Sequence, residues 1–483
     1  MSGAAQPTGN HFAGHQAARV AHWDAVAQSA ATSYGWGAAY HRRLREIYRH
    51  LVAPGQRVLE LGCGYGDLLA ALEPGYGVGV DFSTEMIQGA RQRHPQLNFV
   101  QADAHTFAPD GKFDVIVLSD LVNDVWDVQE ILERVAEAWT PRTRVIINTY
   151  SRLWQPLLSA AAALRLARPV LNQNWLAAHD VKGLLDLAGF EVIRASSEIL
   201  WPLSTPVVGA FCNRILVHTW PFKHLALTNV LLARPKAQPK SADVEPLVSV
   251  IVPARNEAGN IAGVFARTPP MGGGVELVFV EGHSRDDTYA TIEREIKAHP
   301  EWNCQLLRQA GVGKGDAVRL GFAHAKGEVL VILDADLTMP PEELPRFVAA
   351  LRLGQAEFVN GVRLVYPMDG KAMRPLNVIA NHFFSWAFTW LLGQPVKDTL
   401  CGTKALWRRD YERIVANRRQ FGDFDPFGDF DLLFGAAKLN LKICDMPIRY
   451  QERSYGTTNI QRWRHGLLLL RMLWFALWRL KFV

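Results

Sequence analysis

The amino-acid sequence predicts two successive α/β domains, the first of them Rossmann-like, and three observations lead to this fold class. At 483 residues the chain is longer than a single compact core usually extends. Strand-like runs of Val, Ile and Leu alternate with helical patterns over residues 41–235, and the alternation starts again at residue 248. Residues 236–247, between the two series, contain Pro, Lys and Ser without periodicity, which is typical of an interdomain linker.

The composition is that of an ordinary globular protein. Hydrophobic residues make up 49% of the chain and charged residues 20%, which disfavours both a disordered and a polytopic membrane protein. The five cysteines are scattered without a Cys-x-x-Cys pair, so neither a disulfide framework nor a zinc site is expected. No basic segment followed by an apolar run opens the chain, and no uncharged apolar stretch reaches the roughly 20 residues that span a bilayer. We therefore predict neither a secretory leader nor a spanning helix.

The elements of the first half follow in order. Residues 1–40 are predicted to be a helical or flexible segment. The pattern after them is a strand, a glycine turn, a helix and a second strand, which is a βαβ opening. Two buried strands, a helix that leads into another strand, and a final strand are then predicted, at residues 113–120, 144–150, 179–196 and 227–235.

A glycine turn and three acids form the first candidate site. Gly62, Gly64 and Gly66 follow the first strand, where glycine permits a tight turn and lets a ligand approach the backbone. The acids Glu60, Asp81 and Asp103 lie at the ends of three successive strands. A carboxylate at Asp81 can accept both hydroxyls of a ribose, and Asp103 could receive an adenine amine. The alternatives are a turn that binds nothing or one that binds NAD, and NAD is disfavoured because the turn reads ELGCGYG rather than G-x-G-x-x-G.

Over roughly residues 40–235 this arrangement resembles the class I methyltransferases that use S-adenosylmethionine (SAM). The resemblance implies that the three glycines cradle the methionine end of SAM, that Asp81 holds the ribose and that Asp103 contacts the adenine. It also implies that Ser119 and Asp120, which follow a buried strand, face the transferring methyl group.

Methyl transfer to an oxygen also needs a base. Asp120, Asp124 and His179 are the candidates that the sequence offers. For each of them the alternative is a solvated side chain or a helix cap.

In the second half, polar clusters follow three apolar strands. They are the ends of SVIVPARNE, VFVEGHSRDDT and GEVLVILDADL, and parallel strands bring such ends to one edge of a sheet. Residues two apart in an extended segment point the same way, so Asp334 and Asp336 can together bind Mg²⁺ or Mn²⁺, which bridges a diphosphate. Two unpaired buried carboxylates would be costly, which favours a metal site over a chance pair.

Over about residues 248–455 these clusters resemble glycosyltransferase family 2, with the GT-A fold, and especially its branch of dolichol-phosphate and bacterial polyprenyl-phosphate enzymes. The resemblance implies a nucleotide-sugar site in which Asp334 and Asp336 hold the metal, Asp336 also being catalytic. The residues implied to bind the nucleotide sugar are Pro253, Arg255, Glu257, Glu281, Asp286, Lys314, Asp334 and Arg453. Glu281 is followed by Gly282 where the family often has two acids, and Thr338 stands where the mannosyltransferases often have Gln.

For the acceptor the resemblance implies a lipid phosphate bound by Arg363 and Arg374, although a surface salt bridge is the alternative for each arginine. The segment FGDFDPFGDFDLL departs from that branch because it carries four acids. A phosphate acceptor is already anionic and needs no base. A sugar hydroxyl does need one, and Asp429 or Asp431 is then the catalytic candidate.

The tail at 459–483 is predicted to be a basic amphipathic helix. From Arg449 to the end there are seven basic residues and one acid, so this stretch has a net charge of +6. Because the whole chain has a net charge of +5, the remaining residues sum to −1. Arginines spaced along a helix rich in Leu, Trp and Phe favour peripheral contact with a membrane, here its cytoplasmic face. The alternatives are a helix docked on the second domain or at a dimer interface. An apolar segment at 382–392 is either a second membrane-facing surface or core.

Together these observations predict a bifunctional methyltransferase and glycosyltransferase of glycoconjugate synthesis, with family domains at 41–235 and 248–458. In the alternative hypothesis the methyltransferase-like domain only binds SAM or regulates its neighbour. A nucleic-acid partner is not expected, because the charge outside the tail sums to −1.

Overall fold

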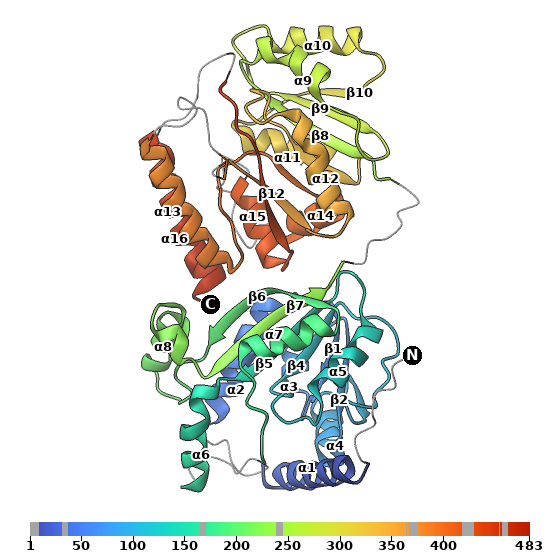
Figure 1. The fold of residues 1–483 in the computed structure, drawn as a ribbon, viewed down its shortest axis with the longest axis vertical. Coiled ribbons are helices and arrows are strands. Elements are labelled where there is room, and N and C mark those ends of the chain that lie inside the picture. The colour runs from blue at the N-terminus through green and yellow to red at the C-terminus, as the bar shows by residue number, and fades with distance from the viewer. Residues whose placement is uncertain are drawn as a thin grey trace. The chain divides into compact units, whose positions relative to one another are not determined.

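The computed structural model describes residues 9–30, 37–164, 171–237, 245–363, 365–366, 375–417, 429–453, 455 and 462–483. It divides into two compact units, Met1–Lys236 with Phe482–Val483, and Ala237–Lys481. Each unit is built on one seven-stranded mixed sheet, so the predicted fold class of two successive α/β domains is confirmed (Figure 1). The proposed linker at 236–247 falls largely outside the described residues.

The first unit alternates strands and helices as its sequence predicts. Its strands are β1 (Arg57–Leu61), β2 (Tyr76–Asp81), β3 (Asn98–Gln101), β4 (Val115–Ser119), β5 (Arg144–Tyr150), β6 (Phe190–Glu198) and β7 (Thr228–Pro235). Its α-helices are α1 (Gly9–Ala30), α2 (Gly37–Leu51), α3 (Asp67–Ala71), α4 (Thr84–Arg93), α5 (Val128–Val135), α6 (Gln155–Ala163), α7 (Ala178–Leu187) and α8 (Val208–Arg214).

The order of the strands in the first sheet fixes where a ligand can bind. The order is β3-β2-β1-β4-β5-β7-β6, with β7 antiparallel to both of its neighbours. From β1 the chain continues outward to β2, and from β4 it continues to β5 on the other side, so the carboxyl ends of β1 and β4 form a topological switch point. Open α/β sheets bind ligands in the crevice at such a point.

The second unit is built in the same way. Its strands are β8 (Val248–Ala254), β9 (Val275–Glu281), β10 (Asn303–Arg308), β11 (Val329–Ile332), β12 (Phe358–Val362), β13 (Lys404–Trp407) and β14 (Ile443–Pro447). Its α-helices are α9 (Ile261–Arg267), α10 (Thr288–Ala298), α11 (Lys314–His324), α12 (Leu344–Arg352), α13 (Pro375–Leu392), α14 (Arg408–Asn417), α15 (Asp429–Lys438) and α16 (Arg462–Ala476).

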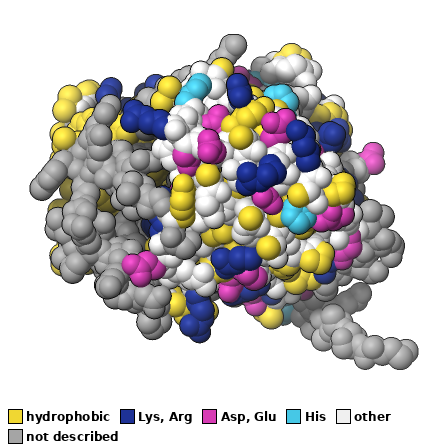
Figure 2. All heavy atoms as spheres, turned by 90° about the horizontal axis from the view of Figure 1, so that it is seen from above, with side chains coloured by type: hydrophobic (Ala, Val, Ile, Leu, Met, Phe, Trp, Pro, Cys, Tyr) yellow, Lys and Arg dark blue, Asp and Glu magenta, His cyan; other side chains and the backbone are white. Residues whose placement is uncertain are grey.

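In the second sheet the order is β10-β9-β8-β11-β13-β12-β14. Strands β8 to β11 are mutually parallel, whereas β13 runs antiparallel between β11 and β12. The three polar clusters after β8, β9 and β11 therefore emerge on one edge, as the sequence predicts. Figure 2 shows one face of the molecule on which Lys and Arg side chains are interspersed with Asp and Glu.

Helix α13 places part of the segment 382–392 in the core, while other side chains of the segment are exposed. Phe388 is fully buried and stacks on Phe434 at 5.7 Å between ring centroids. Trp386 on the same helix is 67% exposed. No helix among the described residues is both long and apolar enough to cross a membrane.

The last turn of the tail differs from the helix predicted over 459–483, and residues 459–461 lie outside the described residues. Helix α16 begins at Arg462 and is followed by a π-helical turn over Leu477–Lys481. Within this turn Leu480 is buried, and the Lys481 ammonium lies 5.3 Å from the ring centre of Trp390 on α13. The wider π-helical turn ends the regular α-helical spacing of the tail.

Candidate active sites

The glycine turn after β1 leaves open space above one glycine. Gly62, Gly64 and Gly66 adopt φ angles of 73°, 51° and 71°, a region that glycine enters without steric cost. A Cβ at Gly62 or Gly66 would lie within 3 Å of a neighbouring side chain, 2.8 Å from Leu121 in one case and 2.6 Å from Phe99 in the other. A Cβ at Gly64 would meet nothing within 4 Å. Packing thus requires glycine at positions 62 and 66, whereas Gly64 leaves room for a ligand against the backbone.

Two of the predicted acids lie beside this turn. Asp81 accepts hydrogen bonds from the backbone N–H of Gly64 and of Ser83, each at 2.9 Å, so it also holds the turn in shape. Glu60 is only 2% exposed, and its Oε2 atom has no hydrogen-bond partner. Burial raises the pKa of Glu60 well above its ordinary value.

The third acid, Asp103, is contacted by helix α1. Its Oδ1 atom accepts from the backbone N–H and the ring Nδ1 of His105, at 2.7 and 2.6 Å, and its Oδ2 atom accepts from Gln16 at 2.7 Å. Although burial opposes ionisation, these hydrogen bonds lower the pKa of Asp103. The amine of an adenine ring at this position would therefore compete with the Gln16 side chain for the Oδ2 atom of Asp103.

Helix α1 supplies further contacts that the sequence did not reveal. Asp24 accepts a 2.5 Å hydrogen bond from Ser83, which caps α4, and Tyr65 of the glycine turn donates to the carbonyl oxygen of Ala27 at 2.9 Å. The segment was predicted only to be helical or flexible. It has no marked apolar stripe, and its partners lie far along the chain, so no local pattern could have located these residues.

Beyond β4, Asp120 lies in a buried polar network. Its Oδ1 atom accepts from Tyr40 at 2.7 Å and from Asn148 at 2.5 Å, and Tyr48 donates to Asn148 at 2.7 Å. Burial raises the pKa of Asp120 to about 6, while hydrogen bonds from Tyr40, Asn148 and Tyr150 limit the rise. Its φ angle of 56° is uncommon for a residue other than glycine, and such strained positions concentrate at functional sites.

The other two candidate bases lie in different surroundings. Asp124 accepts from the Trp23 indole at 2.7 Å and forms an ion pair with Arg19 at 3.4 Å, so helix α1 occupies it. His179 on α7 is 84% exposed and lies 3.2 Å from Asp180. Asp120 lies at the carboxyl end of β4, and burial raises its pKa to about 6.

In the second unit the Asp-x-Asp pair after β11 is faced by two cations. The Lys314 ammonium, at the start of α11, lies 2.5 Å from Asp334. Arg453 lies 2.8 Å from Asp336 and 3.0 Å from Glu257. Although burial opposes ionisation, hydrogen bonds from Arg453 and Thr338 lower the pKa of Asp336. Five residues predicted from four separate motifs therefore meet at one edge of the sheet.

A glycine in a distant loop closes on this cluster. A Cβ at Gly402 would lie 1.9 Å from the Lys314 ammonium and 2.2 Å from a carboxylate oxygen of Asp334. Only glycine fits here without displacing one of these groups.

The residues predicted to bind the nucleoside surround the ends of β8 and β9. Asp286 accepts from the backbone N–H of Ala258 at 3.3 Å and from the Thr288 hydroxyl at 2.5 Å, which ties the two loops together. Tyr455 donates to Asp286 at 3.5 Å. Of the remaining predicted residues, Arg255 is exposed, Pro253 is half-buried, and Glu257 and Glu281 are buried.

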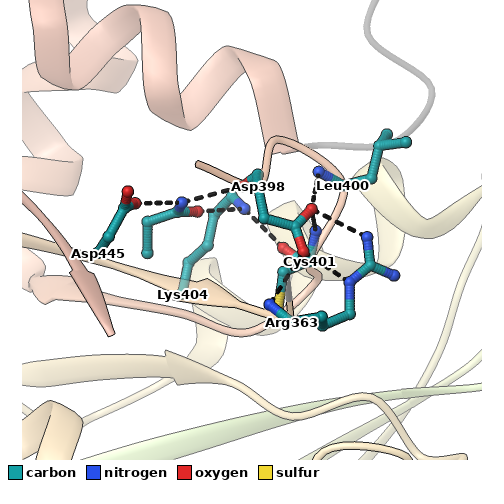
Figure 3. A network of polar contacts seen from close by, with 7 residues as sticks. Arg363, Asp398, Leu400, Cys401, Lys404 and Asp445 are labelled. Atoms are coloured by element: carbon teal, nitrogen blue, oxygen red, sulfur yellow. Dashed lines mark hydrogen bonds and ion pairs between the residues drawn. The ribbon is translucent and has the colours of Figure 1, made fainter. Parts of the chain in front are cut away.

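Arg363, predicted to bind the acceptor phosphate, is held by a buried carboxylate (Figure 3). Its Nε and Nη2 atoms donate to Asp398 at 2.7 and 2.9 Å. Asp398 also accepts from the backbone N–H groups of Leu400 and Cys401, at 3.0 and 3.1 Å. Burial works against both charges, but the pairing lowers the pKa of Asp398 and raises that of Arg363. The fork of Arg363 thus orders the loop that carries Gly402.

One arginine and the four acids of the segment FGDFDPFGDFDLL can be placed only in part. Arg374, Asp423 and Asp425 lie outside the described residues, and for Asp429 only the backbone, at the start of α15, is described. Asp431, in the first turn of α15, is buried. The roles of these residues remain predictions.

Comparison with known families assigns both units. A family model described as a methyltransferase domain matches residues 36–195, and one described as glycosyl transferase family 2 matches residues 249–415. The chain therefore contains a methyltransferase domain followed by a glycosyltransferase family 2 domain. The two matches coincide with the units built on the first and the second sheet.

Curated relatives match the glycosyltransferase part. Undecaprenyl-phosphate 4-deoxy-4-formamido-L-arabinose transferase of Shewanella sediminis is 32% identical over 234 residues, which are 48% of this chain and 65% of the relative. The enzyme of the same name from Edwardsiella ictaluri is 38% identical over 228 residues, or 46% and 64% of the two chains. The chain thus spans less than two thirds of the length of these relatives.

Solved structures resemble each unit at lower identity. An S-adenosylmethionine-dependent methyltransferase from Mesorhizobium loti is 20% identical, with a TM-score of 0.31, over 41% of this chain and 98% of its own. Glucosyl-3-phosphoglycerate synthase from Mycobacterium tuberculosis, in complex with Mn²⁺, UDP and glucosyl-3-phosphoglycerate, is 21% identical, with a TM-score of 0.35, over 49% and 80% of the two chains.

The Arg363–Asp398 pair predicts a large stability difference between two substitutions in the glycosyltransferase unit. Asp398→Ala should lower the free energy of unfolding of this unit by about 3–5 kcal/mol, because it leaves the largely buried Arg363 charge without its partner. Glu342→Ala, which breaks the bidentate but exposed pair with Arg267, should cost less than about 1 kcal/mol. Urea unfolding of the full chain measures both, and equal costs would contradict the structural role of Asp398.

Proposed function

We propose that this chain is a bifunctional enzyme of glycoconjugate synthesis. Its first unit transfers a methyl group from SAM, and its second unit transfers a sugar from a nucleotide sugar with the help of a divalent metal. The observation that carries the proposal is the cluster at the end of β11, where Lys314 and Arg453 face Asp334 and Asp336. Together with the two family matches, this cluster supports a site for an anionic diphosphate.

The residues at β11 fit a divalent cation. Mg²⁺ is ordinarily bound through one or two carboxylates together with substrate phosphates, and Asp334 and Asp336 provide two hard carboxylates on one short segment. When bound, Mg²⁺ or Mn²⁺ neutralises charge on the departing nucleoside diphosphate. Arg453 and Lys314 then have phosphate oxygens as alternative partners, since both are fixed cations at the same edge.

Sugar transfer is proposed to proceed with inversion, as the family resemblance implies. An acceptor oxygen forms the new bond to the anomeric carbon while the bond from that carbon to the diphosphate breaks. We propose a lipid phosphate as the acceptor, which the names of the curated relatives support. A phosphate needs no base, and Arg363 would contribute guanidinium hydrogens that are not donated to Asp398. A membrane-bound saccharide is the second candidate acceptor. Its hydroxyl would need a base, and the carboxylate of Asp431 is a candidate for that role.

For methyl transfer to a hydroxyl, we propose Asp120 as the base. The acceptor hydroxyl would lose its proton to Asp120 as its oxygen takes the methyl group from the sulfonium, leaving S-adenosylhomocysteine. A pKa of about 6 lets this carboxylate remain ionised at neutral pH while holding a proton better than an exposed aspartate. The open space above Gly64 supports SAM as the donor.

The helix pair α13 and α16 is proposed to contact the cytoplasmic face of a membrane peripherally. Trp386, Leu467 and Trp474 are 67%, 68% and 63% exposed, although each is large and apolar. Tryptophan and leucine beside basic side chains suit the interface between lipid head groups and acyl chains.

Calorimetric titration of the full chain in a Mn²⁺ buffer tests the whole proposal. SAM and a panel of UDP- and GDP-sugars would be added separately. Micromolar binding of SAM and of one nucleotide sugar is expected. If SAM binds without ever being turned over, the first unit is a non-catalytic SAM-binding module instead, and if no nucleotide sugar binds, the sugar-transfer proposal is wrong.

Asp334→Ala and Asp336→Ala should each reduce sugar transfer by about three orders of magnitude, because several kcal/mol of stabilisation of the leaving diphosphate are lost. The control is Glu328→Ala, which removes an exposed acid just before the opposite end of the same strand. Transfer is measured with radiolabelled nucleotide sugar and excess Mn²⁺. Full activity in either aspartate variant would refute the metal assignment.

The raised pKa of Asp120 predicts two pH effects. Methyl transfer should fall about tenfold per pH unit below pH 6, since only the ionised form accepts a proton. The free energy of unfolding should decrease as the pH rises from about 4 to 6, because there the folded state binds more protons than the unfolded state. Asp120→Asn should abolish both effects, whereas Asp110→Asn, at an exposed site, should leave them. A carbon NMR titration midpoint of Asp120 near pH 4 would contradict this prediction.

The membrane contact predicts that Trp474→Ala/Trp478→Ala binds anionic vesicles about tenfold more weakly than the unaltered chain, since two exposed aromatic rings no longer enter the interface. Trp220→Ala, which removes a 78% exposed tryptophan from the first unit, serves as the control. Co-sedimentation with vesicles of phosphatidylglycerol and phosphatidylcholine measures both. An equal loss of vesicle binding in the two variants would argue against membrane contact through helices α13 and α16.

A further inference from the structure

A cavity of about 320 Å³ lies between α2 and the loop that leads into α8. None of the motifs identified in the sequence contributes to it. On the α2 side it is lined by Arg42, Arg43 and Glu46, and across from them by Ser204 and Arg214. Three guanidinium groups and one carboxylate thus line the same cavity.

The charges in this cavity are not balanced. Glu46 accepts from Arg43 at 3.0 Å and lies 3.6 Å from Arg214, so a single carboxylate serves two arginines. Arg42 donates to the neutral hydroxyl of Ser204 at 3.2 Å. The lining therefore holds an excess of two positive charges, which favours an anionic ligand.

Arg43 supports this inference independently. Its side chain is only 8% exposed, and it donates to the carbonyl oxygen of Asn213 at 3.1 Å as well as to Glu46. Its Nε atom is buried without a hydrogen-bond partner. A buried cation that is only partly compensated by protein groups is costly, and an anion in the cavity would stabilise the charge of the Arg43 guanidinium.

The remaining wall is apolar. Leu203, Pro206 and Val207 line it, and Val207 is 81% exposed, as is about half of nearby Phe211. Val207 has a φ angle of 64°, which is strained for a β-branched residue. The cavity thus offers cations on one side and exposed apolar surface on the other.

The cavity borders the proposed methyl-transfer site along α2. Ala39, which lines the cavity, immediately precedes Tyr40, and Tyr40 donates to Asp120. Arg43 lies one turn further along the same helix. A ligand whose charged end is held by the arginines would therefore lie against the same helix that carries Tyr40, the hydrogen-bond donor to Asp120.

We propose that this cavity binds the anionic end of the methyl acceptor, and that the acceptor is an amphiphile carrying a phosphate or carboxylate. The inference rests on the proposed methyl transfer, since it assigns the second substrate of the same unit. The cavity selects the anion through Arg42, Arg43 and Arg214, and its apolar wall receives the adjoining part of the molecule.

The test uses the full chain and two probes, inorganic phosphate and octyl phosphate below its micelle concentration, titrated by calorimetry. Arg42→Ala/Arg214→Ala should weaken octyl phosphate binding at least tenfold, because the excess positive charge of the lining is removed. The control Arg45→Ala/Arg49→Ala removes the same charge from α2 outside the cavity and should bind as the unaltered chain does. This control also accounts for phosphate bound elsewhere on the chain.

A substitution of opposite sign sharpens the test. Glu46→Gln should bind octyl phosphate several-fold more tightly, since it frees two arginines from their carboxylate. Unchanged binding in Arg42→Ala/Arg214→Ala, or weaker binding in Glu46→Gln, would overturn the anion site. Equal affinity for inorganic and octyl phosphate would overturn the amphiphile.

SAM titrated into the same samples separates this inference from the proposed function. If the unaltered chain does not bind SAM, methyl transfer fails, whatever the cavity binds. If every variant binds SAM normally while the arginine variant also keeps its octyl phosphate affinity, only the acceptor assignment fails.

Discussion

Acidic side chains at the carboxyl ends of buried parallel strands are the constraint on which both sites depend. A carboxylate at such an edge is partly withdrawn from water, so it must be hydrogen-bonded, paired with a cation, or protonated. The two units meet this requirement differently. In the first, burial raises the pKa of Asp120, and only neutral donors such as Tyr40 and Asn148 limit the rise. In the second, Asp336 is paired with Arg453, and its pKa falls.

This difference matches the chemistry proposed for each unit. A group that exchanges a proton near neutral pH needs neutral neighbours, because a fixed cation would keep it ionised and weakly basic. A group that holds a metal or faces a diphosphate must stay ionised, and the cation that keeps it so is itself a partner for phosphate. The buried Arg363–Asp398 pair is a further carboxylate paired with a cation in the second unit. It orders the loop whose Gly402 packs against Lys314 and Asp334.

Helix α1 contacts the loops that carry the proposed cofactor site of the first unit. Its side chains reach three of the loops at the carboxyl edge, through Gln16 to Asp103, Asp24 to Ser83 and Trp23 to Asp124. Two groups suggested as a ligand contact and as a base are therefore already engaged by protein. The proposed contact of a cofactor with Asp103 requires Gln16 to yield or to share that carboxylate, so α1 contributes a side chain to the proposed site.

The sequence by itself determined the two α/β units, the strands that precede the polar clusters, and the edge at which Gly64, Asp81, Asp334 and Asp336 emerge. These follow from local apolar runs and from the turn chemistry of neighbouring residues, which are legible along the chain. Only the tertiary structure decided which partner each acid has, as with Arg363 and Asp398, and it alone brought Arg43 and Arg214 to one cavity. Such pairings join residues tens to hundreds of positions apart, and they are set by how helices pack on the sheets, which no local pattern encodes.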